Sequence, residues 1–257
     1  MMKLVALLTI ANLTAFAGNK TICGPSDDRI LSTNTKIGRL LDSRTGDGGC
    51  TVTMISKSCG VSAGHCKSVL KVAEFNTSES INGNIQHPAA KDVYDIDQAS
   101  IAYKNGGPGN DWSVFKVLPN NETSLYAGDV QGSYEVAFET PEIGDILRIT
   151  GYGLDSEPTK NLAQQTHTGA LQSTGTTTRN TDDEDSWNGR PYSTLTHTVD
   201  TMGGNSGSTI IRESDEKIIG IHTHGGCSSW GGANQGTLIA KHPELTQAIK
   251  SCLDSDK

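Results

Sequence analysis

Short apolar runs separated by polar turns recur along most of this sequence. Thr51–Ile55 alternates polar and apolar positions, the pattern of a half-buried strand. Trp112–Leu118 and Ile146–Thr150 are further strand-like runs. Thr209–Ile211 and Lys217–Ile221 flank a polar turn, which predicts a hairpin. The 29 glycines scattered among these runs fit many short strands joined by turns.

The same pattern predicts one clear helix, near the C-terminus. Pro243 suits a first helical turn. Apolar residues then recur at steps of three and four and mark one buried face, at Leu245, Ala248, Ile249 and Cys252. Residues 155–195 are rich in Thr, Asn, Asp and Ser, and we expect them to form long surface loops.

The first 17 residues predict a signal peptide. Lys3 provides a positive start, Leu4–Leu13 is mostly apolar, and Ala15–Ala17 is a small-x-small cleavage site. Residues 18–29 are then a short propeptide or an N-terminal arm. We expect a secreted or periplasmic protein that is not bound to a membrane, since no later segment approaches the length of a spanning helix.

Composition narrows the possible functions. The chain has 257 residues and a formal net charge of −8, which argues against nucleic-acid binding because phosphate binding needs a basic face. Six cysteines behind a signal peptide indicate disulfides.

Three segments carry candidate chemistry. Gly203–Ser208 is a glycine-rich turn around Ser206, a hydroxyl that needs a base to become a nucleophile. Its glycines let backbone N–H groups turn inward, so Gly204 and Ser206 are candidate oxyanion donors. His65 lies in the Ser62–Cys66 segment, and Asp111 leads directly into an apolar strand. The order His, Asp, Ser differs from that of subtilisin-type and α/β-hydrolase triads.

Together these segments resemble the chymotrypsin superfamily of serine proteases, over roughly residues 22 to 252. The intervals from 65 to 111 and from 111 to 206 are about those of the family. The resemblance implies an all-β fold of two antiparallel six-stranded barrels with a C-terminal helix. A peptidase domain would span residues 30–257, with barrels of about 30–130 and 131–257 and the triad in the cleft between them.

The resemblance also implies roles for the three residues. His65 would act as general base and then general acid, Asp111 would orient its imidazole, and Ser206 would form the acyl-enzyme. We therefore expect a monomeric serine endopeptidase that acts on protein or peptide substrates, with no cofactor and no metal. A non-proteolytic binding protein or toxin on the same scaffold is an alternative, because fold does not fix function.

The residue before the nucleophile separates two branches of the superfamily. Many animal members have an aspartate there, which pairs with a newly cut N-terminal amine, whereas neutral Asn205 cannot form that ion pair. Asn205–Ser208 resembles instead the bacterial glutamyl endopeptidase branch. Gly220–His222 and Ile22–Arg29 are similar to segments of the same branch.

Two specificities remain open at this point. In glutamyl members a histidine and a threonine or serine bind the substrate carboxylate, and the matching positions are His222 and Thr201. His224 adds one residue before the glycines that follow. Asp200, six residues before Ser206, lies where trypsin-like enzymes keep the acid that attracts Arg or Lys.

The cysteines complete the predictions. A Cys50–Cys66 bridge would close a loop that presents His65, and we favour Cys23–Cys59 and Cys227–Cys252 for the rest. His222, His224 and Cys227 have a spacing that zinc sites also use, and the acidic run Asp182–Asp185 has the oxygen ligands of a calcium site. We favour a disulfide for Cys227 and a solvated loop for the acidic run. His87, His167, His197 and His242 are interpreted as structural or surface residues.

Overall fold

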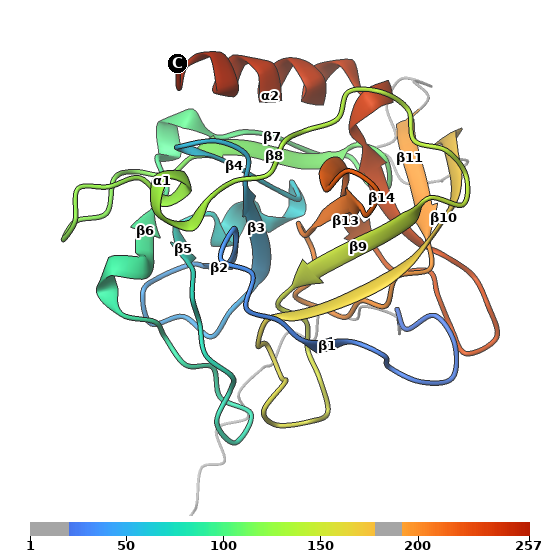
Figure 1. The fold of residues 1–257 in the computed structure, drawn as a ribbon, viewed down its shortest axis with the longest axis horizontal. Coiled ribbons are helices and arrows are strands. Elements are labelled where there is room, and N and C mark those ends of the chain that lie inside the picture. The colour runs from blue at the N-terminus through green and yellow to red at the C-terminus, as the bar shows by residue number, and fades with distance from the viewer. Residues whose placement is uncertain (1–20, 178–191) are drawn as a thin grey trace, which may run out of the picture.

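Two antiparallel β-sheets lie side by side in the computed structural model, which describes residues 21–177 and 192–257 (Figure 1). The predicted signal peptide and the acidic run Asp182–Asp185 lie outside the described residues. Among the described helices, none is long and apolar enough to cross a membrane. The expected all-β architecture with a C-terminal helix is confirmed.

The N-terminal sheet has the strand order β6-β5-β2-β3-β4-β8-β7. Its strands are β2 (Ile37–Leu41), β3 (Cys50–Met54), β4 (Cys59–Ser62), β5 (Val72–Glu74), β6 (Val93–Asp95), β7 (Ala102–Asn105) and β8 (Asp111–Lys116). Short 3-10 turns, at residues 65–69, 90–92 and 98–100, and the helix α1 (Ala127–Gln131) join or follow them. Within the described residues, no ladder joins β6 to β7, so this sheet is an open half-barrel.

The C-terminal sheet closes into a barrel. Its order is β1-β10-β11-β14-β13-β12-β9, and β9 also pairs with β10, which makes a ring of six strands. The strands are β1 (Ile30–Leu31), β9 (Ile146–Gly151), β10 (Gln165–Thr177), β11 (Tyr192–His197), β12 (Thr209–Arg212), β13 (Lys217–His224) and β14 (Asn234–Leu238). The short strand β1 extends this sheet although it precedes the N-terminal strands in sequence.

The prediction of surface loops over residues 155–195 is wrong in part. Residues 165–177 form the long strand β10, which pairs with both β9 and β11. Its threonines are β-branched and favour extended backbone, while their hydroxyls suit a strand that is exposed on one face. Polarity concealed this strand because loops and exposed strands share a polar composition.

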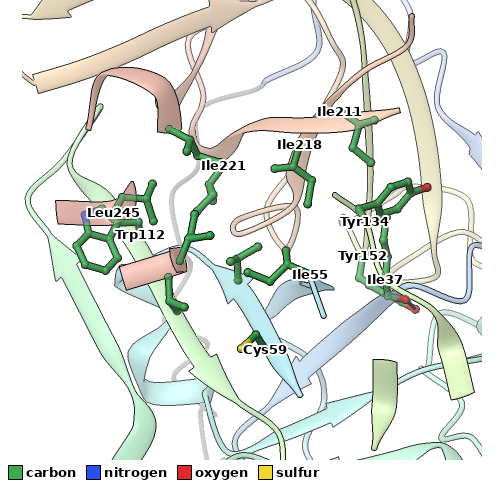
Figure 2. Packing of buried hydrophobic residues seen from close by; sticks show 14 residues of the cluster. Ile37, Ile55, Cys59, Trp112, Tyr134, Tyr152, Ile211, Ile218, Ile221 and Leu245 are labelled. Atoms are coloured by element: carbon green, nitrogen blue, oxygen red, sulfur yellow. Dashed lines mark hydrogen bonds between the residues drawn. The ribbon is translucent and has the colours of Figure 1, made fainter. Parts of the chain in front are cut away.

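A shared apolar cluster joins the two sheets and the C-terminal helix α2 (Pro243–Asp254). It takes Ile37 and Val61 from the N-terminal sheet, Ile218 and Ile221 from the C-terminal sheet, and Leu245 from α2 (Figure 2). Each sheet also has an apolar core of its own. The shared cluster fixes the position of one sheet against the other, which matters for any site built from both.

Three disulfides are present, and two differ from the predicted pairing. Cys50–Cys66 is confirmed, but Cys23 pairs with Cys227 and Cys59 with Cys252. Cys23 lies on a segment that runs along the C-terminal barrel, where its amide meets Asp200, so it cannot reach Cys59. Cys59 on β4 belongs instead to the shared cluster against which Cys252 of α2 packs.

Replacing both Cys59 and Cys252 by serine should lower the free energy of unfolding by about 2–4 kcal/mol. This bridge spans 193 positions, so its loss frees a large unfolded loop. Chemical denaturation of the variant and the parent measures the difference. Non-reducing peptide mapping tests the pairing itself, and a Cys23–Cys59 peptide would contradict the structure.

Candidate active site

A buried carboxylate and an imidazole form the centre of the site. Asp111, the first residue of β8, is fully buried, and its Oδ2 lies 2.5 Å from Nδ1 of His65. Its Oδ1 accepts the backbone N–H groups of Gly64 and His65, at 2.6 and 2.9 Å. A buried carboxylate is costly unless it is hydrogen-bonded, so these contacts hold the imidazole in one orientation.

The backbone around this pair is constrained from both sides. The Thr237 hydroxyl on β14 accepts the Asp111 N–H at 3.2 Å and donates to its carbonyl at 2.9 Å, which ties the acid to the other sheet. A Cβ on Gly64 would lie 1.7 Å from the carbonyl oxygen of Lys104. The glycine beside His65 is therefore required for the loop to approach β7.

The segment that carries Ser206 lies against the loop that carries His65. The Ser206 carbonyl accepts the N–H of Thr51 on β3 at 2.9 Å, and Cys66 Sγ lies 3.8 Å from the same oxygen. A Cβ on Gly207 would lie 2.0 Å from the Ser62 hydroxyl. These contacts place the Ser206 turn beside the loop of His65, which the Cys50–Cys66 bridge closes, at the junction of the two sheets.

No hydrogen bond joins the Ser206 hydroxyl to the His65 ring among the described residues. In ligand-free sites such a bond is often long and tightens only when a substrate binds. The His65 side chain keeps 28% of its exposure, so solvent and ligand reach the imidazole from one side.

Three backbone N–H groups of the Gly203–Ser208 turn have no acceptor among the described residues, those of Gly203, Gly204 and Ser206, and the last two are the predicted oxyanion donors. Gly203 O accepts the Leu154 N–H at 2.8 Å. Since N–H and C=O point oppositely across a trans peptide, the Gly204 N–H faces away from Leu154. Gly204 has φ +100° and a Cβ there would lie 2.2 Å from Tyr152 O, so only glycine fits. The turn can thus present two donors to one anion.

Asp200 faces the N-terminal arm, which we define as residues 21–29. Its two carboxylate oxygens accept the N–H groups of Cys23 and Asp28, at 2.7 and 3.1 Å. Thr201 is also fully buried, and its hydroxyl accepts an N–H of Asn234 at 3.2 Å. That bond leaves the hydroxyl hydrogen of Thr201 able to donate.

A pair of buried histidines crosses the C-terminal barrel, with His197 Nε2 3.2 Å from His222 Nδ1. The Val199 N–H donates to His197 Nδ1, so the proton of His197 is on Nε2 and is donated to His222 Nδ1. The proton of neutral His222 is therefore on Nε2, where it is a donor. Burial lowers the pKa of His197 to about 3 and holds that of His222 well below its usual range, with the neighbouring His197, His224 and His65 adding to the latter.

The extra residue at His224 is accommodated by a β-bulge. The β13–β14 register shifts between His222 and His224, so Thr223 is bulged and His224 lies opposite Gln235. The His224 ring lies edge-on to the His65 ring, with centroids 6.0 Å apart. His224 therefore joins the rim of the site.

Among the residues that the structure describes, two clusters each bring three possible metal ligands within 4.8 Å of one another. In Cys50, His65 and Cys66 the two cysteines form a disulfide. In the other, of Asp28, His167 and Asp200, the His167 nitrogen near Asp200 is Nδ1, whose lone pair already accepts the Asp200 N–H. Both Asp200 oxygens also accept backbone N–H groups. Neither cluster carries an argument for a metal.

Two residues of this neighbourhood escaped the sequence analysis. His197 was interpreted as structural or surface, and Arg29 was named only as the last residue of a propeptide or arm and of the Ile22–Arg29 segment. The signal for His197 is its alternation with apolar Leu195 on β11, which puts an imidazole inside the barrel. Arg29 gave a weaker signal, since it only precedes the apolar pair Ile30-Leu31.

Comparisons with known proteins identify the family of the chain and support its fold. The model of the Trypsin family matches residues 36–246. A solved structure of a Glu endopeptidase in complex with MPD is 18% identical, with a TM-score of 0.64 over 90% of this chain and 99% of that one. The protease Anisep from Arthrobacter nicotinovorans is also 18% identical, with a TM-score of 0.59 over 89% and 98%. No curated protein matches the sequence.

The His197 pair predicts a pH dependence of stability. The pKa of His197 falls from about 6.5 in the unfolded chain to about 3 in the fold. Between these values only the unfolded chain binds the proton, so stability is full above pH 6.5 and is lost as the pH falls toward 3.

His197→Gln should reduce the slope of unfolding free energy against pH between 6 and 4 by about 1.4 kcal/mol per pH unit, the value for one proton. Denaturant titrations across that range measure it. Equal slopes in the variant and the parent would contradict the buried neutral imidazole.

Proposed function

Because the chain belongs to the Trypsin family of serine proteases, we propose that it is an endopeptidase that forms an acyl-enzyme on Ser206 and prefers glutamate before the scissile bond. One observation carries the catalytic assignment. The hydrogen-bonded His65–Asp111 pair lies against the Ser206 turn, and the N–H groups of Gly204 and Ser206 in that turn have no acceptor among the described residues. A base for the hydroxyl and donors for the oxyanion are what acyl transfer requires.

Each residue then has a defined task. His65 Nε2 takes the Ser206 proton as Oγ attacks the substrate carbonyl, and later gives it to the leaving amine. Asp111 accepts the Nδ1–H and stabilises the imidazolium. The N–H groups of Gly204 and Ser206 donate to the tetrahedral oxyanion. Water activated by the same imidazole then hydrolyses the acyl-enzyme and restores the Ser206 hydroxyl.

The preference for glutamate rests on the proton positions of the histidine pair. Two backbone hydrogen bonds join His222 to the residues that follow Ser206. The His222 carbonyl accepts the Gly207 N–H, and the His222 N–H donates to Ser208 O. The hydrogen bonds from Val199 to His197 and from His197 to His222 leave the Nε2–H of His222 as a donor, which suits a carboxylate. The carboxylate of Asp200 faces the arm, which disfavours the Arg or Lys alternative. The structural neighbour described as a Glu endopeptidase supports the same preference.

Secretion is part of the proposal. Three disulfides suit an oxidising compartment, and peptide or protein substrates are available there. The signal peptide at residues 1–17 stays a prediction of the sequence.

A fluorophosphonate should label Ser206, and Ser206→Ala should lower turnover by about three or more powers of ten, because the triad acts as a unit. Intact-mass analysis and hydrolysis of a peptide substrate provide the two measurements. An unlabelled, correctly processed protein would disprove the catalytic assignment. Labelling without cleavage of any protein would favour the binding-protein alternative.

Peptide-library profiling should show cuts after Glu. His222→Ala should lower kcat/KM for a Glu substrate by about 10- to 100-fold, the value of a hydrogen bond to a charge, and change a Gln substrate much less. His87→Ala, a histidine paired with Glu74 on the N-terminal sheet, is the control. Cuts after Arg or Lys would favour Asp200 instead, and unchanged Glu cleavage in His222→Ala would reject the role of His222.

A further inference from the structure

The guanidinium of Arg29 is buried between the N-terminal arm and the Ser206 turn, with 1% of the side chain exposed. We propose that Arg29 is a positioning residue that holds both flanks of the oxyanion donors in place, so that the seated arm is a condition for catalysis. The inference rests on the proposed catalytic role of the Ser206 turn and adds to it a residue from outside the triad and the pocket.

The first flank is Asn205. Arg29 Nη1 donates to Asn205 Oδ1 at 3.4 Å, and the same oxygen accepts the Met202 N–H at 3.0 Å. The Asn205 N–H donates back to Met202 O at 2.9 Å. Asn205 thus closes the turn from both ends, and Arg29 fixes the amide oxygen that does so. Ser206 is the next residue, so its N–H direction follows from this turn.

The second flank is Leu154. Arg29 Nη2 donates to Leu154 O at 2.8 Å, and the Leu154 N–H donates to Gly203 O at 2.8 Å. That second bond orients the peptide whose N–H belongs to Gly204. One guanidinium therefore acts on the residue before each proposed oxyanion donor, on Asn205 directly and on Gly203 through Leu154.

The space for this contact depends on Gly153. A Cβ there would lie 2.1 Å from Asn205 Oδ1 and 2.3 Å from Arg29 Nη1, so a side chain would displace one or the other. The charge of Arg29 is balanced by Asp27, at 2.6 Å, and Asp155, at 3.6 Å. An apolar side chain would anchor the arm without the cost of desolvating a cation. What arginine adds is several directional hydrogen bonds from one rigid plane.

Several contacts fasten the arm upstream of Arg29. Thr21 bridges Thr201, Cys23 is bonded to Cys227, and Asp200 accepts the amides of Cys23 and Asp28. These contacts leave the arm little freedom at its junction with β1. They deliver Arg29 to the one neutral side chain beside the nucleophile, Asn205.

The test compares Arg29→Met, Arg29→Lys, Asn205→Ala and the double variant Arg29→Met/Asn205→Ala in the full processed protein. Arg44→Met is the control, because it also removes an arginine from an ion pair, with Asp95, on the exposed surface. The readouts are kcat and KM per fluorophosphonate-titrated site, the binding of a peptide aldehyde that forms a tetrahedral adduct, and amide hydrogen exchange at Leu154 and Asn205.

We expect Arg29→Met to lower kcat by about 10- to 100-fold, below the loss for deleting a whole oxyanion donor, with KM changed less than about threefold. Aldehyde binding should weaken by a similar factor, and exchange at Leu154 and Asn205 should accelerate about tenfold. Arg29→Lys should recover only part of kcat, since one ammonium cannot span both flanks. The double variant should lose less than the product of the two single losses.

Unchanged kcat per titrated site in Arg29→Met would overturn the proposal. If thermal stability alone fell, Arg29 would be a purely structural anchor of the arm. Full additivity in the double variant would also overturn it. Failure of the proposed function has a different signature, a parent protein that neither reacts with the fluorophosphonate nor cleaves peptides. Hydrogen exchange still tests Arg29 in that case, and unaltered exchange at Leu154 and Asn205 would reject the inference.

Discussion

Burial of the Asp111 carboxylate is the constraint on which the arrangement of this site depends. A charge without solvent needs hydrogen bonds from fixed donors, and here they come from Gly64, His65 and the imidazole ring. The backbone of Asp111 is held in turn by Thr237 of the other sheet. The carboxylate is thus satisfied within the N-terminal sheet, while Thr237 ties the backbone of the acid to the C-terminal barrel. Docking of the two sheets therefore fixes where the His65–Asp111 pair lies relative to the Ser206 turn.

Thr51 has the corresponding role for the Ser206 turn. Its N–H donates to Ser206 O, and its hydroxyl accepts the Tyr152 N–H at 3.1 Å and donates to Gly204 O at 3.0 Å. One side chain of the N-terminal sheet thus binds a turn that belongs to the C-terminal barrel. The apolar cluster around Ile221 and Leu245 stabilises the docking of the two sheets through nondirectional packing (Figure 2). The hydrogen bonds of Thr51 and Thr237 fix how the sheets are aligned.

The features that the sequence predicted well depend on residues within short segments. The strands at 51–55 and 112–118 and the helix after Pro243 follow from local periodicity, and the triad candidates follow from motif order and spacing. Cys50 and Cys66 were paired correctly because both flank the loop of His65.

The features that it missed depend on contacts between distant segments. Cys59 meets Cys252 because β4 packs near α2, and β10 is a strand because its backbone pairs with β9 and β11. Asp200 was open to two interpretations since only the path of the arm shows which way its carboxylate faces. His197 was unremarkable in the sequence because its partner is another buried imidazole, 25 positions away.

The N-terminal arm contacts both the Ser206 turn and Asp200, the residues proposed to determine catalysis and specificity. The amides of Cys23 and Asp28 bind the carboxylate of Asp200, the residue that would otherwise favour a basic substrate side chain. The same arm delivers the Arg29 guanidinium to Asn205 and Leu154. A buried aspartate in place of Asn205 would need a cation to balance its charge. Neutral Asn205 needs only a hydrogen-bond donor, and the Arg29 side chain of the arm provides it. Under the proposed function, displacing the arm would release the Ser206 turn and the Asp200 carboxylate together. One structural element would then govern both the donors for the substrate carbonyl and the charge available to the substrate side chain.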